Sequence, residues 1–91
     1  MIKVIKFWSP SCGPCRMLAP VMEQVIKDYP EFELIDINTD EDMKEGGEKI
    51  RKYSVRSIPA VFFEKDDNIV KSFMGAKSEQ QLKEIFDSIE I

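Results

Sequence analysis

The chain has 91 residues, of which 43% are hydrophobic and 33% are charged, and its formal net charge at pH 7 is −4. This length and composition predict one globular domain, residues 1–91, with a small core, and they exclude intrinsic disorder. The acidic balance argues against nucleic acid as a partner. No apolar run approaches the roughly 18 residues that span a bilayer, and Lys3 and Lys6 interrupt the N-terminal stretch, so we expect a cytoplasmic protein that has no membrane contact.

The first predicted elements are a strand and a helix on either side of the only two cysteines. Residues 2 to 8 are mostly β-branched and aromatic, which is typical of a strand that is buried on both faces. After Cys12, apolar residues recur at helical spacing as far as Tyr29. Pro20 removes a backbone donor inside this helix, so we expect a kink after a first segment that ends near Ala19. The thiols therefore lie at the N-terminus of a helix.

Cys12 and Cys15 allow several interpretations. A structural disulfide that closes so short a loop contributes only about 2 kcal/mol, and a reducing cytosol would open it. Zinc takes about four ligands, and a chain that has no His and no second thiol pair cannot supply a soft site alone. We therefore expect no metal, although a metal or iron–sulfur site shared between two chains remains an alternative. Thiol–disulfide exchange is the interpretation that fits the position of the pair.

The two cysteines are predicted to have different roles. If Cys12 is the N-cap residue, Pro14 has no N–H to offer, so the donor within reach of the Cys12 sulfur is the amide of Cys15. That amide and the positive end of the helix favour the thiolate of Cys12. Cys15 lies one turn further, against the sheet, and should be more buried. Cys12 is therefore the predicted nucleophile, and Cys15 is the predicted resolving thiol.

The middle of the chain indicates a second strand and a weak helix. Residues 32 to 38 alternate in polarity and predict a strand that is joined to the first in a right-handed βαβ unit. Its polar residues are suited to protecting a sheet edge; they are Glu33, Asp36 and Asn38. Residues 41 to 53 are charged and helical in character but are interrupted by Gly46 and Gly47. We expect this segment to present a solvated face.

The last third of the chain predicts a hairpin and an amphipathic helix. Residues 60 to 64 and 69 to 74 flank the sequence KDDN, which is typical of a β-hairpin. Ser78 and Gln81 then form a capping box ahead of apolar residues at helical spacing. We expect this final helix to cover the sheet.

Two motifs resemble those of the thioredoxin family over nearly the whole chain. They are W-S-P-S-C-G-P-C-R-M-L-A-P at the cysteines and S-I-P-A about forty residues later. The Gly-Pro pair between the cysteines resembles thioredoxins in particular, because glutaredoxins usually carry Pro-Tyr there. The resemblance implies an α/β minimal thioredoxin fold, β-α-β-α-β-β-α, with a four-stranded mixed sheet in the order 2-1-3-4 flanked by helices. Because the sequence starts at the strand that leads into the cysteines, we expect the form of the fold that lacks the usual first strand and helix of the family.

The resemblance also implies a substrate-binding surface, formed by Trp8, Gly13, Pro14, Ile58, Pro59 and Gly75. The Ile58–Pro59 peptide is implied to be cis and to face the thiols, with the Ile58 backbone binding extended substrate and the proline ring keeping metals away. Gly75 is implied to lie beside the substrate groove, although an ordinary strand-end turn explains it equally well. Trp8 is implied to flank the site, although a core aromatic residue explains it nearly as well.

Three positions depart from the family pattern. Lys6 aligns with a buried acidic residue that helps to move a proton from the resolving thiol, and Leu34 stands where the lysine partner of that acid is expected. Either Lys6 extends its stem to water, or it stays near Cys15, where it modulates the ionisation of the thiol or takes its proton. Ser11 replaces a frequent tryptophan, which removes apolar docking surface.

These patterns together predict a monomeric thiol–disulfide oxidoreductase that reduces protein disulfides through a mixed disulfide. It needs no bound cofactor beyond the redox-active Cys12–Cys15 pair. The expected partners are disulfide-containing proteins, and either thioredoxin reductase or glutathione as the electron donor. One alternative is a glutathione-coupled, glutaredoxin-like reductase. Another is a non-catalytic protein-binding module on the same fold, in which the thiols are incidental.

Overall fold

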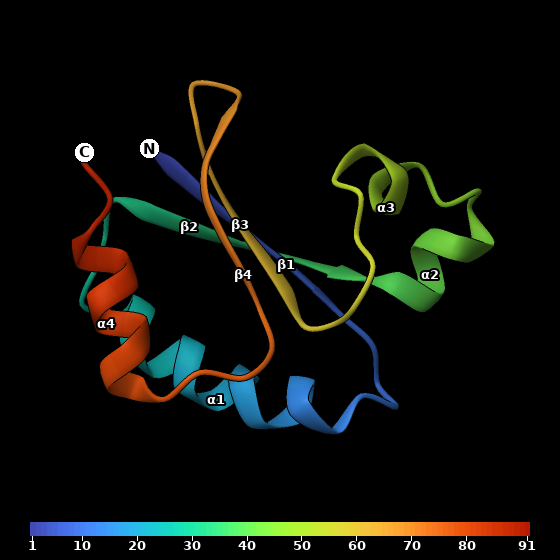
Figure 1. Ribbon diagram of the computed structural model, residues 1–91, viewed down its shortest axis with the longest axis horizontal. Helices are drawn as coiled ribbons and strands as arrows, with labels where there is room; N and C mark the ends of the chain where they lie inside the picture. The colour runs from blue at the N-terminus through green and yellow to red at the C-terminus, as the bar shows by residue number, and fades with distance from the viewer.

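A four-stranded sheet in the order β2-β1-β3-β4 forms the centre of the molecule (Figure 1). The computed structural model describes residues 1–91, and its elements in chain order are β1 (Ile2–Trp8), α1 (Gly13–Ile26), β2 (Phe32–Asn38), α2 (Thr39–Lys44), α3 (Glu48–Lys52), β3 (Ala60–Lys65), β4 (Asn68–Met74) and α4 (Glu79–Asp87). Strand β1 pairs in parallel with β2 and antiparallel with β3, which pairs antiparallel with β4. The predicted fold class and strand order are confirmed.

The two faces of the sheet follow from the alternation of side chains along β1. Even-numbered Ile2 and Val4 join the larger core, which packs against α1 and α4. Odd-numbered Ile5 and Phe7 join a smaller cluster on the opposite face, the side on which Figure 1 places α2 and α3. The larger cluster consists of Ile2, Val4, Leu18, Met22, Val25, Phe32, Val61, Phe63, Leu82, Phe86 and Ile89. Any side chain at an even position of β1 therefore points toward α1.

Helix α1 runs from Gly13 to Ile26 with Pro20 inside it, and the kink expected at Pro20 stays a prediction. Two other segments differ in detail from the sequence prediction. The segment expected to be one weak helix consists of α2 and α3, because Gly46 and Gly47 have φ values of 111° and 72° that a helix does not allow. The hairpin turn is shorter than the sequence KDDN suggested. Only two residues join β3 to β4, both at positive φ, and these are Asp66 and Asp67.

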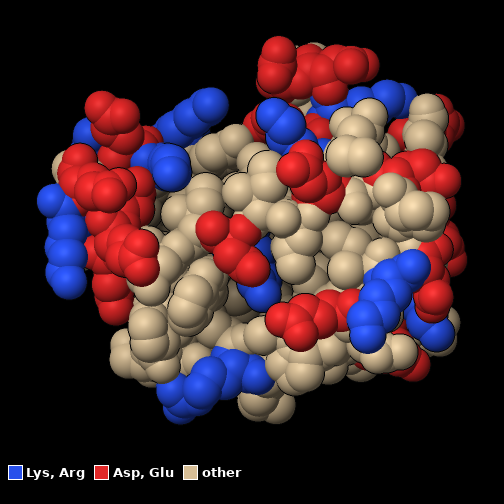
Figure 2. Space-filling model, turned by 180° about the vertical axis from the view of Figure 1, so that it is seen from behind, with Lys and Arg blue, Asp and Glu red and all other residues tan.

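Both chain ends lie at the end of the sheet that is farther from the cysteines (Figure 1). Strand β1 leads from Met1 toward Cys12, so the N-terminus and the disulfide are at its opposite ends. At the other terminus, Nζ of Lys65 donates to the carbonyl oxygen of Glu90 at 3.2 Å. Basic and acidic side chains are interspersed over the face shown in Figure 2. No helix is long and apolar enough to cross a membrane.

The two tyrosines make carboxylate contacts that give a testable pH dependence. The hydroxyl of Tyr29 donates to Asp87 at 2.7 Å, and that hydrogen bond is the main reason why the pKa of Tyr29 rises to about 12. Burial, followed by a 2.7 Å hydrogen bond to Glu64, raises the pKa of Tyr53 to about 12. Because the folded state favours both protonated phenols, their contribution to stability is complete below about pH 10 and is lost as the pH rises toward 12.

We therefore expect little tyrosinate absorbance in the folded protein at pH 10, and a falling free energy of unfolding above that pH. A spectrophotometric titration of the native protein, with urea-unfolded protein as the reference, measures the first effect. Asp87→Asn should lower the pKa of Tyr29 alone, because it removes the carboxylate that accepts the phenol proton. Native tyrosines that were half ionised at pH 10 would contradict this prediction.

Candidate active site

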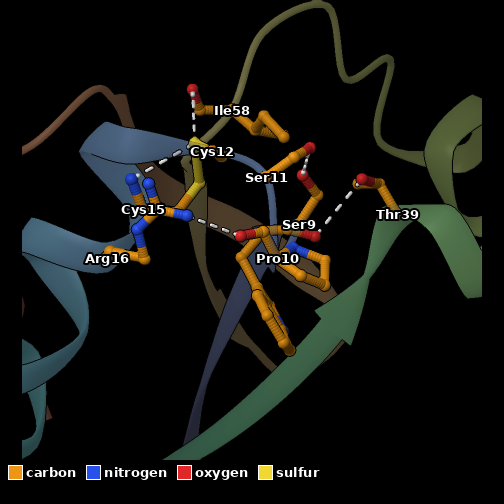
Figure 3. The surroundings of a disulfide bond; sticks show 9 residues. Ser9, Pro10, Ser11, Cys12, Cys15, Arg16, Thr39 and Ile58 are labelled. Carbon is orange, nitrogen blue, oxygen red and sulfur yellow. Dashed lines mark hydrogen bonds between the residues drawn. A yellow bond between two sulfur atoms is a disulfide. The ribbon is translucent and has the colours of Figure 1, made fainter.

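The cysteine pair lies where β1 ends and α1 begins (Figure 3). Cys12 is the N-cap residue of α1, with φ −90° and ψ 110°, and its Sγ accepts a hydrogen bond from the backbone N–H of Cys15 at 3.2 Å. The two residues form a disulfide, with their Cα atoms 5.2 Å apart. Cys12 is half-buried, whereas Cys15 is only 4% exposed. The outer sulfur is therefore accessible to a partner, and the inner sulfur is not.

The first turn of α1 favours negative charge on the Cys12 sulfur. Gly13 and Pro14 are the first two helical residues, and Pro14 has no N–H, so the amide of Cys15 is the capping donor. The first turn has no acidic side chain that would oppose a thiolate. The positive end of the helix adds to this effect. After reduction, Cys12 is consequently suited to attack and Cys15 to follow.

A loop distant in sequence faces the outer sulfur. The Ile58–Pro59 peptide bond is cis, as the resemblance implied. The carbonyl oxygen of Ile58 lies 3.7 Å from Sγ of Cys12, although 46 residues separate the two (Figure 3). Pro59 is fully buried, and its carbonyl oxygen accepts the N–H of Gly75 at 2.9 Å. This contact links the proline loop to the end of β4.

Gly75 has a backbone conformation that side chains rarely adopt. Its φ is 85°, and a Cβ added there would meet no atom within 4 Å. The backbone conformation therefore explains why a glycine stands at position 75, whereas crowding by other residues of the chain does not. The position beside a substrate groove that the resemblance implies stays a prediction.

Gly75→Ala should lower the free energy of unfolding by about 1–2 kcal/mol, because alanine at this φ is strained even where space is available. Urea unfolding monitored by circular dichroism measures the loss. Gly13→Ala is the matched control, since Gly13 is helical and also has open space around it. Equal stabilities of the Gly75→Ala variant and the parent protein would show that the backbone at this position relaxes freely.

The loop before Cys12 is held by contacts that sequence reasoning missed. Ser9 is 4% exposed, and its Oγ lies 3.2 Å from Oγ of Ser11. The side chain of Thr39, at the start of α2, donates to the carbonyl oxygen of Trp8 at 3.2 Å. Arg16 donates to the carbonyl oxygen of Pro10 at 2.7 Å. No local pattern in the sequence marks these partners, because each depends on a loop conformation.

Lys6 is buried and lines a cavity together with the inner cysteine. It is 5% exposed, and its Nζ lies 3.1 Å from Oδ1 of Asp36. A cavity of about 230 Å³ is lined by Lys6, Trp8, Cys15, Arg16, Ala19, Glu23 and Asp36. Lys6 therefore does not extend its stem to water; it is buried and lines a cavity that Cys15 also lines. No group of three or more Cys, Asp or Glu side chains is arranged to hold a metal ion.

The charged partner of Lys6 in this structure is Asp36, and Leu34 is not beside Lys6. In the parallel register Lys6 lies opposite Asp36, whereas Leu34 lies opposite Val4 and packs against the larger core. Even positions on both strands face α1, which brings the two charged side chains to the same side of the sheet. Asp36, expected only to protect a sheet edge, is therefore also part of the cavity.

The remaining predicted site residues surround the cysteines at different depths. Trp8 is half-buried and lines the cavity with Cys15, so it contributes to the wall behind the disulfide. Gly13 is half-buried and Pro14 is exposed, and both lie in the first turn of α1. Their assignment to substrate binding stays a prediction.

The chain is similar to known thioredoxins along most of its length. A family model described as Thioredoxin matches residues 1–88. A thioredoxin from Bacillus subtilis is 36% identical over 80 residues, which cover 87% of this chain and 73% of that protein. One from Pseudomonas aeruginosa is 35% identical over 86 residues, covering 93% and 76%. The X-ray structure of Fasciola hepatica thioredoxin superposes with a TM-score of 0.83 at 35% identity, covering 98% and 81%.

Proposed function

This chain belongs to the thioredoxin family and is a thiol–disulfide oxidoreductase, and we propose that it acts as a reductant of protein disulfides, with Cys12 as nucleophile and Cys15 as resolving thiol. The observation that supports these roles is the contrast between the two sulfurs. Cys12 is half-buried and receives the Cys15 amide, whereas Cys15 is 4% exposed. A folded substrate therefore reaches only the outer sulfur.

The proposed reaction has two displacements at sulfur. The Cys12 thiolate attacks one sulfur of a substrate disulfide, and the other substrate sulfur leaves as a thiolate and takes up a proton. Cys15 then loses its proton and attacks Sγ of Cys12, which releases the second substrate thiol and closes the Cys12–Cys15 disulfide. Two electrons pass from the cysteine pair to the substrate. The structure, with its disulfide formed, corresponds to the product of this sequence.

Substrate backbone is proposed to bind across the proline loop and the first turn of α1. The carbonyl oxygen of Ile58 faces Cys12 at 3.7 Å, which places a backbone acceptor beside the attacking sulfur. An extended segment that hydrogen-bonds there would bring its disulfide to Cys12. Trp8, Gly13, Pro14 and Gly75 are the other proposed contacts.

The electron donor is proposed to be a thioredoxin reductase, in a reducing compartment such as the cytoplasm. The resemblance of the Gly-Pro pair to thioredoxins favours this donor over glutathione. An insulin-reduction assay supplied with NADPH and a bacterial thioredoxin reductase, or with glutathione and glutathione reductase, distinguishes the two. Turnover with the first system supports the proposal. Turnover with glutathione alone would favour a glutaredoxin-like role, and no turnover when dithiothreitol recycles the pair would overturn the reductase function itself.

A further inference from the structure

The cavity behind Cys15 contains an ion pair whose two members differ greatly in solvent access. The side chain of Lys6 is 6% exposed, whereas that of Asp36, which lies 3.1 Å away, is 49% exposed. Cys15 lines the same cavity and is itself buried. The other charged residues that line it, Arg16 and Glu23 on α1, are exposed. Among the charged residues that line this cavity, the only buried one is therefore a cation, Lys6.

We infer that the Lys6–Asp36 ion pair is a positioning element for the resolving step, in which the Lys6 ammonium stabilises the thiolate of Cys15 and Asp36 holds Lys6 in the cavity. This inference rests on the proposed role of Cys15. Cys15 must lose its proton before it can attack Sγ of Cys12. A buried cation that lines the same cavity as the sulfur lowers the free energy of the thiolate relative to the thiol.

The asymmetry of the ion pair determines the sign of this effect. Water screens a half-exposed carboxylate more strongly than it screens a buried ammonium, so Asp36 cancels only part of the field of Lys6 at Cys15. Arg16 adds no opposing charge, and its guanidinium is held by the carbonyl oxygen of Pro10 at 2.7 Å. Glu23 opposes Lys6, but from an exposed position. The net field at the inner sulfur consequently favours negative charge.

The same charge also affects the redox equilibrium. The disulfide is neutral, whereas the reduced inner cysteine gains negative charge as the pH rises. Lys6 therefore stabilises the reduced protein only where Cys15 is ionised, so its effect must grow with pH. A stabilised reduced form makes a dithiol a weaker reductant. Removing the charge should make this protein a stronger reductant at alkaline pH and leave it unchanged in acid.

Stopped-flow reaction of the reduced full chain with Ellman's reagent separates the two chemical steps. The first thiol-anion release depends on reagent concentration and reports attack by Cys12. The second does not depend on it and reports resolution by Cys15. For Lys6→Met we expect the pH at which the second step is half-maximal to rise by about one unit, the lower end of the range for loss of a neighbouring opposite charge.

Equilibration with glutathione at several pH values gives an independent readout. We expect Lys6→Met and the parent protein to have the same equilibrium constant at pH 5, and to differ by about tenfold at alkaline pH, which is equivalent to about 30 mV. A purely structural effect of the substitution would not produce a difference that appears only as Cys15 ionises.

Three further variants control for charge and packing. Lys6→Arg keeps the cation and should retain the parent pH profile. Lys3→Met removes an exposed lysine from the same strand and should change neither readout. Asp36→Asn leaves Lys6 without its counter-charge, so the half-maximal pH should fall. Because Asp36 is half-exposed, this variant should fold even if Lys6→Met does not.

The outcomes separate the inference from the function on which it rests. If the parent protein shows no second step, the proposed role of Cys15 is wrong. If the parent resolves normally and neither Lys6→Met nor Asp36→Asn moves the pH profile, the resolving role stands and the role of the ion pair is overturned. Opposite shifts in the two variants, with Lys6→Arg unchanged, support the inference.

Discussion

Cys15→Ser is expected to stop catalytic turnover and to leave the protein covalently attached to its substrate through Cys12. Attack by Cys12 does not need the inner thiol, so the mixed disulfide still forms. Its release then depends on a thiol from solution instead of a group held one helical turn away. Because a well-placed intramolecular group acts at a very high effective concentration, we expect turnover with insulin to fall at least about 10³-fold.

Insulin turbidity measures the loss of turnover, and non-reducing mass spectrometry detects the adduct. The control is Cys12→Ser, which should lose turnover equally but form no adduct, because Cys15 is 4% exposed and cannot reach a folded substrate. Alkylation of the reduced parent protein with limiting iodoacetamide should modify Cys12 first. An adduct on Cys15 in the Cys12→Ser variant would reverse the assignment of the two roles.

Phe86→Ala is expected to have the largest effect on stability, lowering the free energy of unfolding by about 3–5 kcal/mol. Phe86 is 1% exposed, and its ring centroid lies 4.8 Å from that of Phe32, 4.9 Å from that of Tyr29 and 5.2 Å from that of Phe63. The substitution leaves a cavity at the point where α4 packs on the sheet. A domain of this size has only about 5–15 kcal/mol of stability in total, so the variant is expected to be close to unfolding at 37 °C.

Urea unfolding of the reduced and oxidised forms measures this change. Val70→Ala is the control, because Val70 is 49% exposed on β4 and its truncation should alter stability by about 0.5 kcal/mol or less. A loss below about 1 kcal/mol in Phe86→Ala would mean that α4 repacks over the gap, and that it contributes less to the core than its aromatic contacts indicate.

The elements of the fold were predictable because their signals are local. The alternation of Phe32–Asn38, the capping box at Ser78 and the helical spacing after Cys12 each lie within one element. The N-cap role of Cys12 was equally predictable from the sequence. Pro14 has no N–H, so the next backbone N–H that can donate to the Cys12 sulfur is that of Cys15. Local rules therefore located both sulfurs and their relative depth.

The partner of Lys6 was not predictable in the same way. Choosing between Leu34 and Asp36 requires the register of two strands that are joined through a helix, and a shift of two residues keeps every side chain on its correct face. Alternation of polarity cannot detect such a shift. The bonds of Thr39 and Arg16 to the loop before Cys12 were missed for a related reason, because they depend on loop backbone that no periodicity describes.

The position of the two chain ends has a practical consequence. Met1 precedes the strand that leads to Cys12, and the C-terminal residues meet Lys65 at the same far end of the sheet. A fusion partner, purification tag or surface linker attached at either end would therefore point away from the reactive sulfur. Immobilising the protein through one terminus should yield a solid-phase reagent that still opens disulfides in proteins passed over it.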